Sequence, residues 1–122
     1  MAFRLFPERI CLVSDALRCC GMPEGAYELG GQTVYLKEGV ARLAGGDIAG
    51  STTDLFDGLR NAVAFGILVE TAARAATLLP ARVIGCDGLI GSIEPGKLAD
   101  FVVCDRDLNR KAVYLGGRLI EE

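Results

Sequence analysis

Residues 9–16 read Arg-Ile-Cys-Leu-Val-Ser-Asp-Ala, and this short stretch decides the expected fold. Residues 10–14 form a nearly continuous apolar run, which is typical of a strand buried on both faces, as in a parallel sheet. The run ends at Asp15. A carboxylate at this end of such a strand lies where α/β barrels build their active sites. Asp15 is therefore a candidate catalytic residue; the alternative is that it caps the turn after the strand.

The segments after Asp15 predict an antiparallel meander followed by helices. Three β-like runs cover residues 26–29, 32–37 and 40–43, and they are separated by Gly30-Gly31 and by Glu38-Gly39. Ser51-Thr52-Thr53-Asp54 matches a capping box with Ser51 as N-cap, which predicts a helix that ends at Gly66.

The second half of the chain predicts two more helices and then further strands. An alanine-rich helix is expected from Val69 to Leu79, where Pro80 ends it, and a short helix is expected over residues 80–84. The β-pattern then returns over residues 100–104, 112–115 and 118–120. A buried parallel strand needs parallel neighbours, and the segments before the helices offer none for residues 10–14.

Composition excludes several classes of function. The 122 residues include 13 basic and 16 acidic side chains, for a formal charge of -3, so we expect neither a nucleic-acid nor a membrane partner. The sequence has no histidine, which removes imidazole bases and histidine metal ligands. No run of residues has the length of a membrane span and no signal peptide is visible, so a cytoplasmic protein is expected. Since 51% of residues are apolar, the chain either covers its excess with a partner or belongs to something larger.

The five cysteines are expected to be reduced and mostly buried. Their number is odd and no C-x-x-C spacing occurs, so a metal site is the weaker interpretation. A thiol function of Cys19-Cys20 beside Arg18 is weaker still, because one adjacent arginine is a poor reason to expect a reactive thiol.

A second candidate site is Ile48-Ala49-Gly50-Ser51. Gly50 would let a ligand approach the backbone, and the predicted helix after Ser51 would direct free N–H groups at that ligand. The alternative is an ordinary helix cap. The glycine-rich residues 91–97 match no phosphate or dinucleotide motif and are predicted to be a connection.

Five motifs in order resemble the C-terminal part of N-acetylglucosamine-6-phosphate deacetylases of the amidohydrolase superfamily. They are residues 9–16, Tyr-Glu-Leu-Gly-Gly-Gln-Thr-Val at 27–34, Ile-Ala-Gly-Ser at 48–51, Ala-Thr-Leu-Leu-Pro-Ala-Arg at 76–82, and Gly-Ser-Ile-Glu-Pro-Gly-Lys-Leu-Ala-Asp at 91–100. The resemblance implies an α/β fold, namely the C-terminal fragment of a metal-dependent (β/α)8 TIM barrel plus strands of a small β-sandwich. Residues 1–90 would supply the last barrel strand, the meander and the closing helices, and residues 91–122 the sandwich strands.

The resemblance also implies a reaction. In the family, a divalent metal of the zinc or iron class activates the water that attacks the N-acetyl carbonyl. The carboxylate at the position of Asp15 takes the proton and passes it to the departing amine. Ile48, Ala49, Gly50 and Ser51 would contact the amino-sugar phosphate, and the products would be acetate and glucosamine 6-phosphate.

The family's metal ligands, a glutamate and two histidines, are expected upstream, so no metal ligand is predicted in this chain. Alone it should be inactive, and the full-length enzyme is expected to be a homodimer. The alternative is an independently folded, non-catalytic α/β module that dimerises through its apolar surface.

Overall fold

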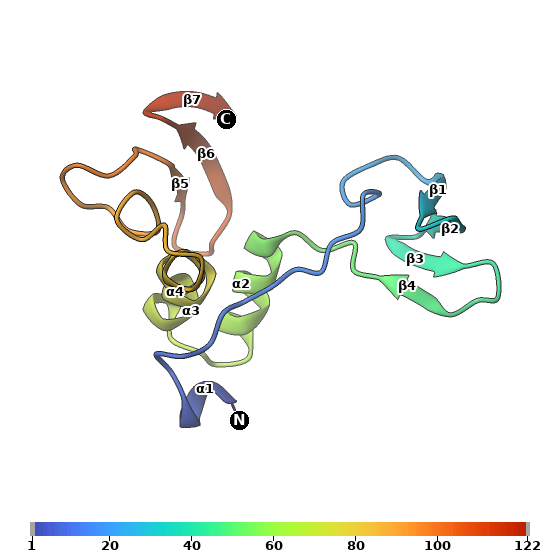
Figure 1. The fold of residues 1–122 in the computed structure, drawn as a ribbon, viewed down its shortest axis with the longest axis horizontal. Helices are drawn as coiled ribbons and strands as arrows, with labels where there is room; N and C mark the ends of the chain where they lie inside the picture. Colours follow the sequence, from blue (N-terminus) through green and yellow to red (C-terminus); the bar gives the residue numbers. More distant parts are fainter. Residues whose placement is uncertain (1, 122) are drawn as a thin grey trace. The chain divides into compact units, whose positions relative to one another are not determined.

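The computed structural model describes residues 2–121, which divide into two compact units (Figure 1). One unit is Val13–Gly58, and the other comprises the described residues up to Leu12 and from Leu59 onward. Each unit has its own small core.

The unit Val13–Gly58 is built on a four-stranded antiparallel meander. Its strands are β1 (Gly25–Leu29), β2 (Gln32–Lys37), β3 (Val40–Leu43) and β4 (Ile48–Gly50), in that order across the sheet. Side chains alternate along β2, so Val34 and Leu36 are buried while their neighbours are exposed. Together with Cys19 and Ala41 they form the core of this unit. The three predicted runs are confirmed, and β4 is a fourth strand that the sequence pattern did not predict.

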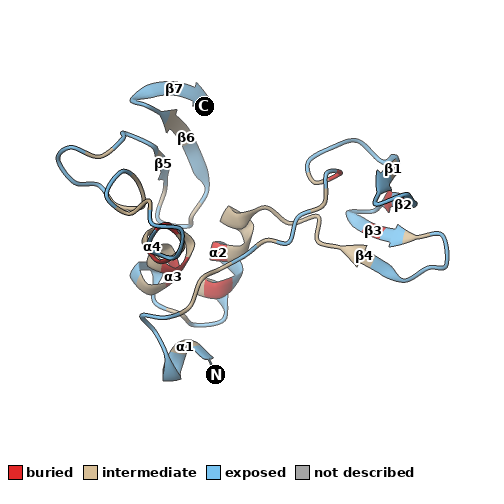
Figure 2. Ribbon diagram, in the orientation of Figure 1, coloured by how far each residue is buried: buried red, intermediate tan, exposed pale blue. Residues whose placement is uncertain are grey.

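The second unit contains short helices packed through small side chains. They are α1 (Ala2–Leu5), α2 (Leu55–Ala64), which begins before the boundary at Leu59, α3 (Val69–Ala76) and α4 (Leu78–Val83). Leu59 and Ala62 of α2 pack with Ala72 of α3 in one buried cluster (Figure 2). The small alanine side chains let the two helices approach closely at this cluster.

Two predicted helix boundaries are wrong. Ser51 does not cap α2, since the helix begins at Leu55 and the Asp54 carboxylate accepts the Asp57 backbone N–H at 2.7 Å. The second helix ends at Ala76 because Thr77 has non-helical backbone angles, φ −130° and ψ −80°. Pro80 therefore lies in the first turn of α4, where a missing N–H costs no helical bond.

The predicted strand over residues 10–14 does not form within the described residues. The two sheets are antiparallel throughout, so they offer this segment no parallel neighbour. Leu12 instead donates its backbone N–H to the Ala75 carbonyl at 2.8 Å, and Val13 is 81% exposed. The only parallel pairing among the described residues is a single bridge between Ala16 and Ser51.

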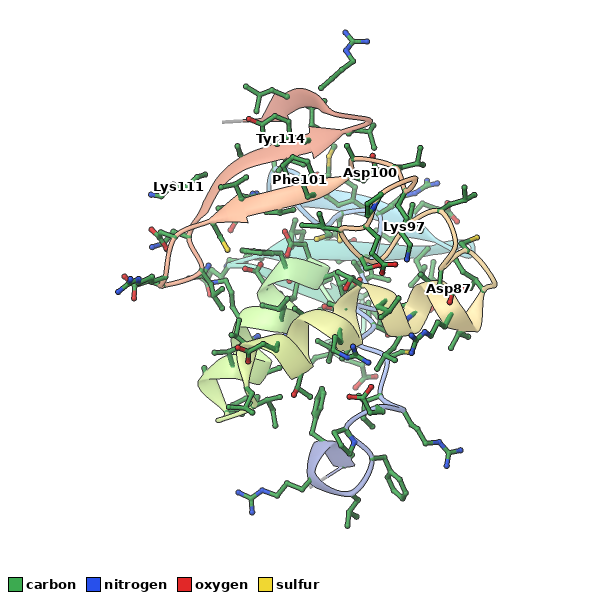
Figure 3. The ribbon with its side chains drawn as sticks, turned by 90° about the vertical axis from the view of Figure 1, so that its left-hand side faces the viewer. Asp87, Lys97, Asp100, Phe101, Lys111 and Tyr114 are labelled. Atoms are coloured by element: carbon green, nitrogen blue, oxygen red, sulfur yellow. The ribbon has the colours of Figure 1, made fainter. Side chains whose placement is uncertain are left out.

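A three-stranded antiparallel sheet ends the described chain. Its strands are β5 (Phe101–Cys104), β6 (Arg110–Leu115) and β7 (Arg118–Glu121), close to the predicted runs. Phe101 and Tyr114 face each other in register and their rings stack with centroids 4.7 Å apart (Figure 3). Strands β5 and β6 contain no buried residue, so the sheet has no buried core of its own.

Residues 91–97 form a connection, as predicted, and Gly91 is required in it. Its φ is +92°, and a Cβ there would lie 2.9 Å from the Ala81 Cβ and 3.0 Å from the Leu78 Cα.

The same connection is held by a small polar network, in which Lys97 donates to Ser92 Oγ at 2.5 Å and forms an ion pair with Glu94. The Ser92 hydroxyl bond, followed by the Lys97 bond, lowers the pKa of Glu94.

The cysteines are free thiols, as expected, but they are not mostly buried. Only Cys19 is buried; Cys11, Cys20 and Cys86 are half-buried and Cys104 is exposed. None of the helices in the described part of the chain is long and apolar enough to cross a membrane.

The turn between β5 and β6 provides a test of the local structure. The Asp105 carboxylate accepts the Asn109 side-chain amide at 3.0 Å and the Asn109 backbone N–H at 2.8 Å. Chiefly these bonds lower the pKa of Asp105 from 3.8 to about 2. A lowered folded-state pKa contributes stability above pH 3.8, and this contribution is lost as the pH falls toward 2.

We expect Asn109→Ala to raise the Asp105 pKa toward 3.8 in an NMR titration, because the substitution removes the side-chain amide that donates to the carboxylate. An unchanged titration would contradict this assignment of the cause.

Candidate functional site

Two stretches that the sequence analysis singled out separately lie side by side in the unit Val13–Gly58. The Ser51 N–H donates to the Asp15 carbonyl at 3.3 Å, and the Leu17 N–H donates to the Ser51 carbonyl at 2.9 Å. These two bonds enclose the parallel bridge between Ala16 and Ser51. The backbone next to the candidate carboxylate is therefore fixed to the end of β4, although 36 positions separate Asp15 from Ser51.

Asp15 occupies an unusual backbone conformation. Its φ is +51°, in the left-handed region that side chains other than glycine rarely adopt and that aspartate and asparagine tolerate best. Its side chain is exposed and has no hydrogen bond or ion pair with another described residue. Ser14, not Asp15, provides the side-chain acceptor in this turn, from the Ala16 N–H at 3.4 Å. The carboxylate is thus available to a ligand, and the turn-cap alternative has no hydrogen bond to support it.

The second candidate stretch is a strand end rather than a helix start. Residues 48–50 form β4, and α2 begins four residues beyond Ser51 at Leu55, so no helix N-terminus is directed from Ser51 at a ligand. The Ser51 hydroxyl accepts the Thr53 backbone N–H at 3.0 Å. Ile48 is 68% exposed, and Ala49 packs against the core of this unit.

Gly50 allows the two stretches to meet. A Cβ at position 50 would lie 2.9 Å from both Cγ and Cδ2 of Leu17, closer than any ordinary contact. The Leu17 side chain thus lies directly over the Gly50 backbone. The sequence predicted close approach of a ligand to the Gly50 backbone, but within the described residues the approaching group is the Leu17 side chain.

Thr52, directly after Ser51, also makes two hydrogen bonds to other stretches of this unit. Its hydroxyl donates to the Gly39 carbonyl in the turn between β2 and β3. Its own carbonyl accepts the Cys20 thiol at 3.1 Å. Thr52 and its two partners were not identified from the sequence, because hydrogen bonds across 13 and 32 positions leave no local pattern.

The described residues contain no side-chain cluster suited to a divalent metal ion. No group of three or more histidine, cysteine, aspartate or glutamate side chains in the described residues could hold a metal ion. The sequence also has no histidine.

A shallow hollow of about 150 Å³ lies elsewhere in the same unit. It is lined by apolar side chains, including Leu17 and Val34, and by the Arg18–Glu28 ion pair at 3.8 Å. None of the predicted site residues lines it.

Comparison with known proteins places this geometry in a family. The sequence profile of the amidohydrolase family matches residues 32–120. The chain belongs to the amidohydrolase family. It is 42% identical over 113 residues to the N-acetylgalactosamine-6-phosphate deacetylase of Escherichia coli O157:H7, covering 92% of this chain. It is 36% identical over 121 residues to the N-acetylglucosamine-6-phosphate deacetylase of Vibrio furnissii, covering 98% of this chain.

A solved relative shows the same fold. It is an aspartate-to-alanine variant of N-acetyl-D-glucosamine-6-phosphate deacetylase from Mycobacterium smegmatis, in complex with N-acetyl-D-glucosamine-6-phosphate. The TM-score is 0.82 at 39% identity, and the match covers 93% of this amidohydrolase chain. The chain spans 31% of that structure and 30% of each of the two curated relatives.

The contact between Gly50 and Leu17 can be tested by a double substitution. Gly50→Ala should lower the free energy of unfolding by about 1–3 kcal/mol, because the added methyl group overlaps Leu17. In a Leu17→Ala background the same substitution should cost much less, since the overlapping atoms are gone. Urea denaturation of the four proteins measures both costs. Equal costs in the two backgrounds would rule out this contact.

Proposed function

We propose that this chain is the C-terminal portion of an amino-sugar phosphate deacetylase, with N-acetylglucosamine 6-phosphate as its substrate. The observation that carries the proposal is the backbone contact of Asp15, whose carboxylate is exposed, with Ser51, at the end of the stretch that would contact the sugar. The names of the relatives support the reaction class. The solved relative holds the acetylated sugar in an aspartate-to-alanine variant, which supports the choice of this sugar as the substrate class.

In the proposed reaction Asp15 moves one proton. Its carboxylate accepts a proton from the water whose oxygen forms the new bond to the N-acetyl carbon. It then donates that proton to the nitrogen as the C–N bond breaks, which releases acetate and glucosamine 6-phosphate. Ile48, Ala49, Gly50 and Ser51 contact the sugar phosphate and keep its amide within reach of Asp15. Asp15 supplies the proton transfer in this step, whereas substrate binding and water activation also draw on residues outside this chain.

The domain assignment belongs to the same proposal. Residues 1–90 represent the last part of a TIM barrel, in which residues 10–14 become a strand once parallel neighbours are present. Residues 91–122 contribute strands to a β-sandwich. The exposed apolar side chains of β5–β7 are consistent with a sheet that is covered in the complete enzyme. A homodimer is proposed for that complete enzyme.

The C4 epimer is a second candidate substrate. Identity to the N-acetylgalactosamine-6-phosphate deacetylase is 42%, compared with 36% for the Vibrio furnissii glucosamine-type relative. Because a single hydroxyl distinguishes the two sugars, an assay of the proposed function needs both substrates.

A chimera tests the proposal. The part of the Escherichia coli O157:H7 relative that matches this chain is replaced by the chain, and acetate release is measured with both epimers. We expect an active chimera, and we expect Asp15→Asn to lower kcat by about 10²- to 10⁴-fold with little change in KM. Asparagine also tolerates the left-handed backbone at this position, so the variant should fold.

Asp107→Asn is the matched control, because this exposed carboxylate lies in the turn between β5 and β6. It should leave kcat unchanged. The 122-residue chain alone is purified until no host deacetylase activity remains and is then assayed with added zinc. It should release no acetate from either substrate. An Asp15→Asn chimera that retains full kcat would remove Asp15 from the mechanism.

A further inference from the structure

We propose that Thr52 is a positioning residue that keeps the end of β4 at a fixed distance from Asp15. The proposal rests on the function proposed above, because it concerns the spacing between the proton-transfer group and the stretch that contacts the substrate. Thr52 itself lies outside both groups, directly after Ser51.

The contacts of Thr52 connect three separate stretches of the unit Val13–Gly58. Its hydroxyl is bound to the Gly39 carbonyl, in the turn between β2 and β3. Its carbonyl accepts the thiol of Cys20, which follows Asp15 by five positions. We call Thr52, Gly39 and Cys20 the Thr52 clamp. The clamp attaches the residue after Ser51 both to the sheet and to the segment that carries Asp15.

Few backbone bonds hold the Asp15 loop at the end of β4, so additional contacts matter there. Only the two bonds to Ser51 join the backbones at the parallel bridge, and the longer of them is 3.3 Å. Asp15 also lies in a left-handed conformation that a loosened loop would leave, because extended or helical backbone is more favourable for aspartate. The clamp adds two hydrogen bonds immediately after this bridge, one of them partly buried. It therefore opposes relaxation of the Asp15 loop away from β4.

The clamp predicts a specific kinetic effect. Loss of the Thr52 hydroxyl removes no substrate-contacting side chain, so KM should change less than kcat. Proton transfer depends on alignment, and displacements near 1 Å can cost about 100-fold in rate. We expect Thr52→Val in the active chimera to lower kcat by about tenfold and to leave KM within about twofold. Thr52→Ser keeps the hydroxyl and should restore kcat to within about twofold of the parent.

Thr53→Val is the matched control. This neighbouring threonine contributes its backbone N–H to Ser51 Oγ, which valine keeps, and its hydroxyl has no hydrogen bond to another described residue. It should leave kcat and KM unchanged. A Thr52→Val chimera with the parent's kcat would overturn the proposal, and so would a Thr52→Ser chimera as slow as Thr52→Val.

Amide hydrogen exchange in the 122-residue chain separates this proposal from the proposed function. Thr52→Val should accelerate exchange at the Leu17 and Ser51 amides by about tenfold, as expected for the loss of one hydrogen bond, and Thr52→Ser should not. If the parent chimera has no activity, the proposed function fails and exchange alone decides the role of the clamp. Accelerated exchange then supports it, and unchanged exchange overturns it.

Discussion

The site depends on the short parallel contact between Ala16 and Ser51. It is the one place where the described chain pairs two segments in the parallel direction, and two backbone hydrogen bonds hold it. Because Gly50 has no Cβ, the Leu17 side chain can lie over its backbone and the two segments can meet. The Thr52 clamp follows directly after this contact. Without this contact Asp15 would be an exposed loop carboxylate with no relation to β4.

This arrangement explains why an α/β enzyme signature occurs in a chain with antiparallel sheets. Residues 10–14 have the composition of a doubly buried strand but form no ladder, since the described residues offer them no parallel partner strand. Val13 is correspondingly 81% exposed. The sheet β5–β7 also exposes apolar side chains on strands without buried residues. Both features agree with a chain that spans 30% of the Escherichia coli O157:H7 and Vibrio furnissii relatives.

Local signals predicted much of the secondary structure. Gly30-Gly31 and Glu38-Gly39 marked the turns that separate β1, β2 and β3 in the meander. The failures had nonlocal causes. The strand over residues 10–14 needs partners that its own sequence cannot reveal, and β4 is only three residues long. Asp54 replaced Ser51 as the helix cap because both fit the capping pattern, and the Ser51 carbonyl and N–H were already bound to Leu17 and Asp15.

Only part of the candidate site could be predicted from the sequence. Asp15 and residues 48–51 could be proposed from residue type and resemblance, whereas their proximity and the Thr52 clamp required the structure.

The most direct test of this account is an NMR measurement of nuclear Overhauser effects across the Ala16–Ser51 bridge in the 122-residue chain. The account predicts strong backbone cross-peaks and a protected Leu17 amide. Absent cross-peaks together with a Leu17 amide that exchanges at the rate of an unfolded peptide would contradict it.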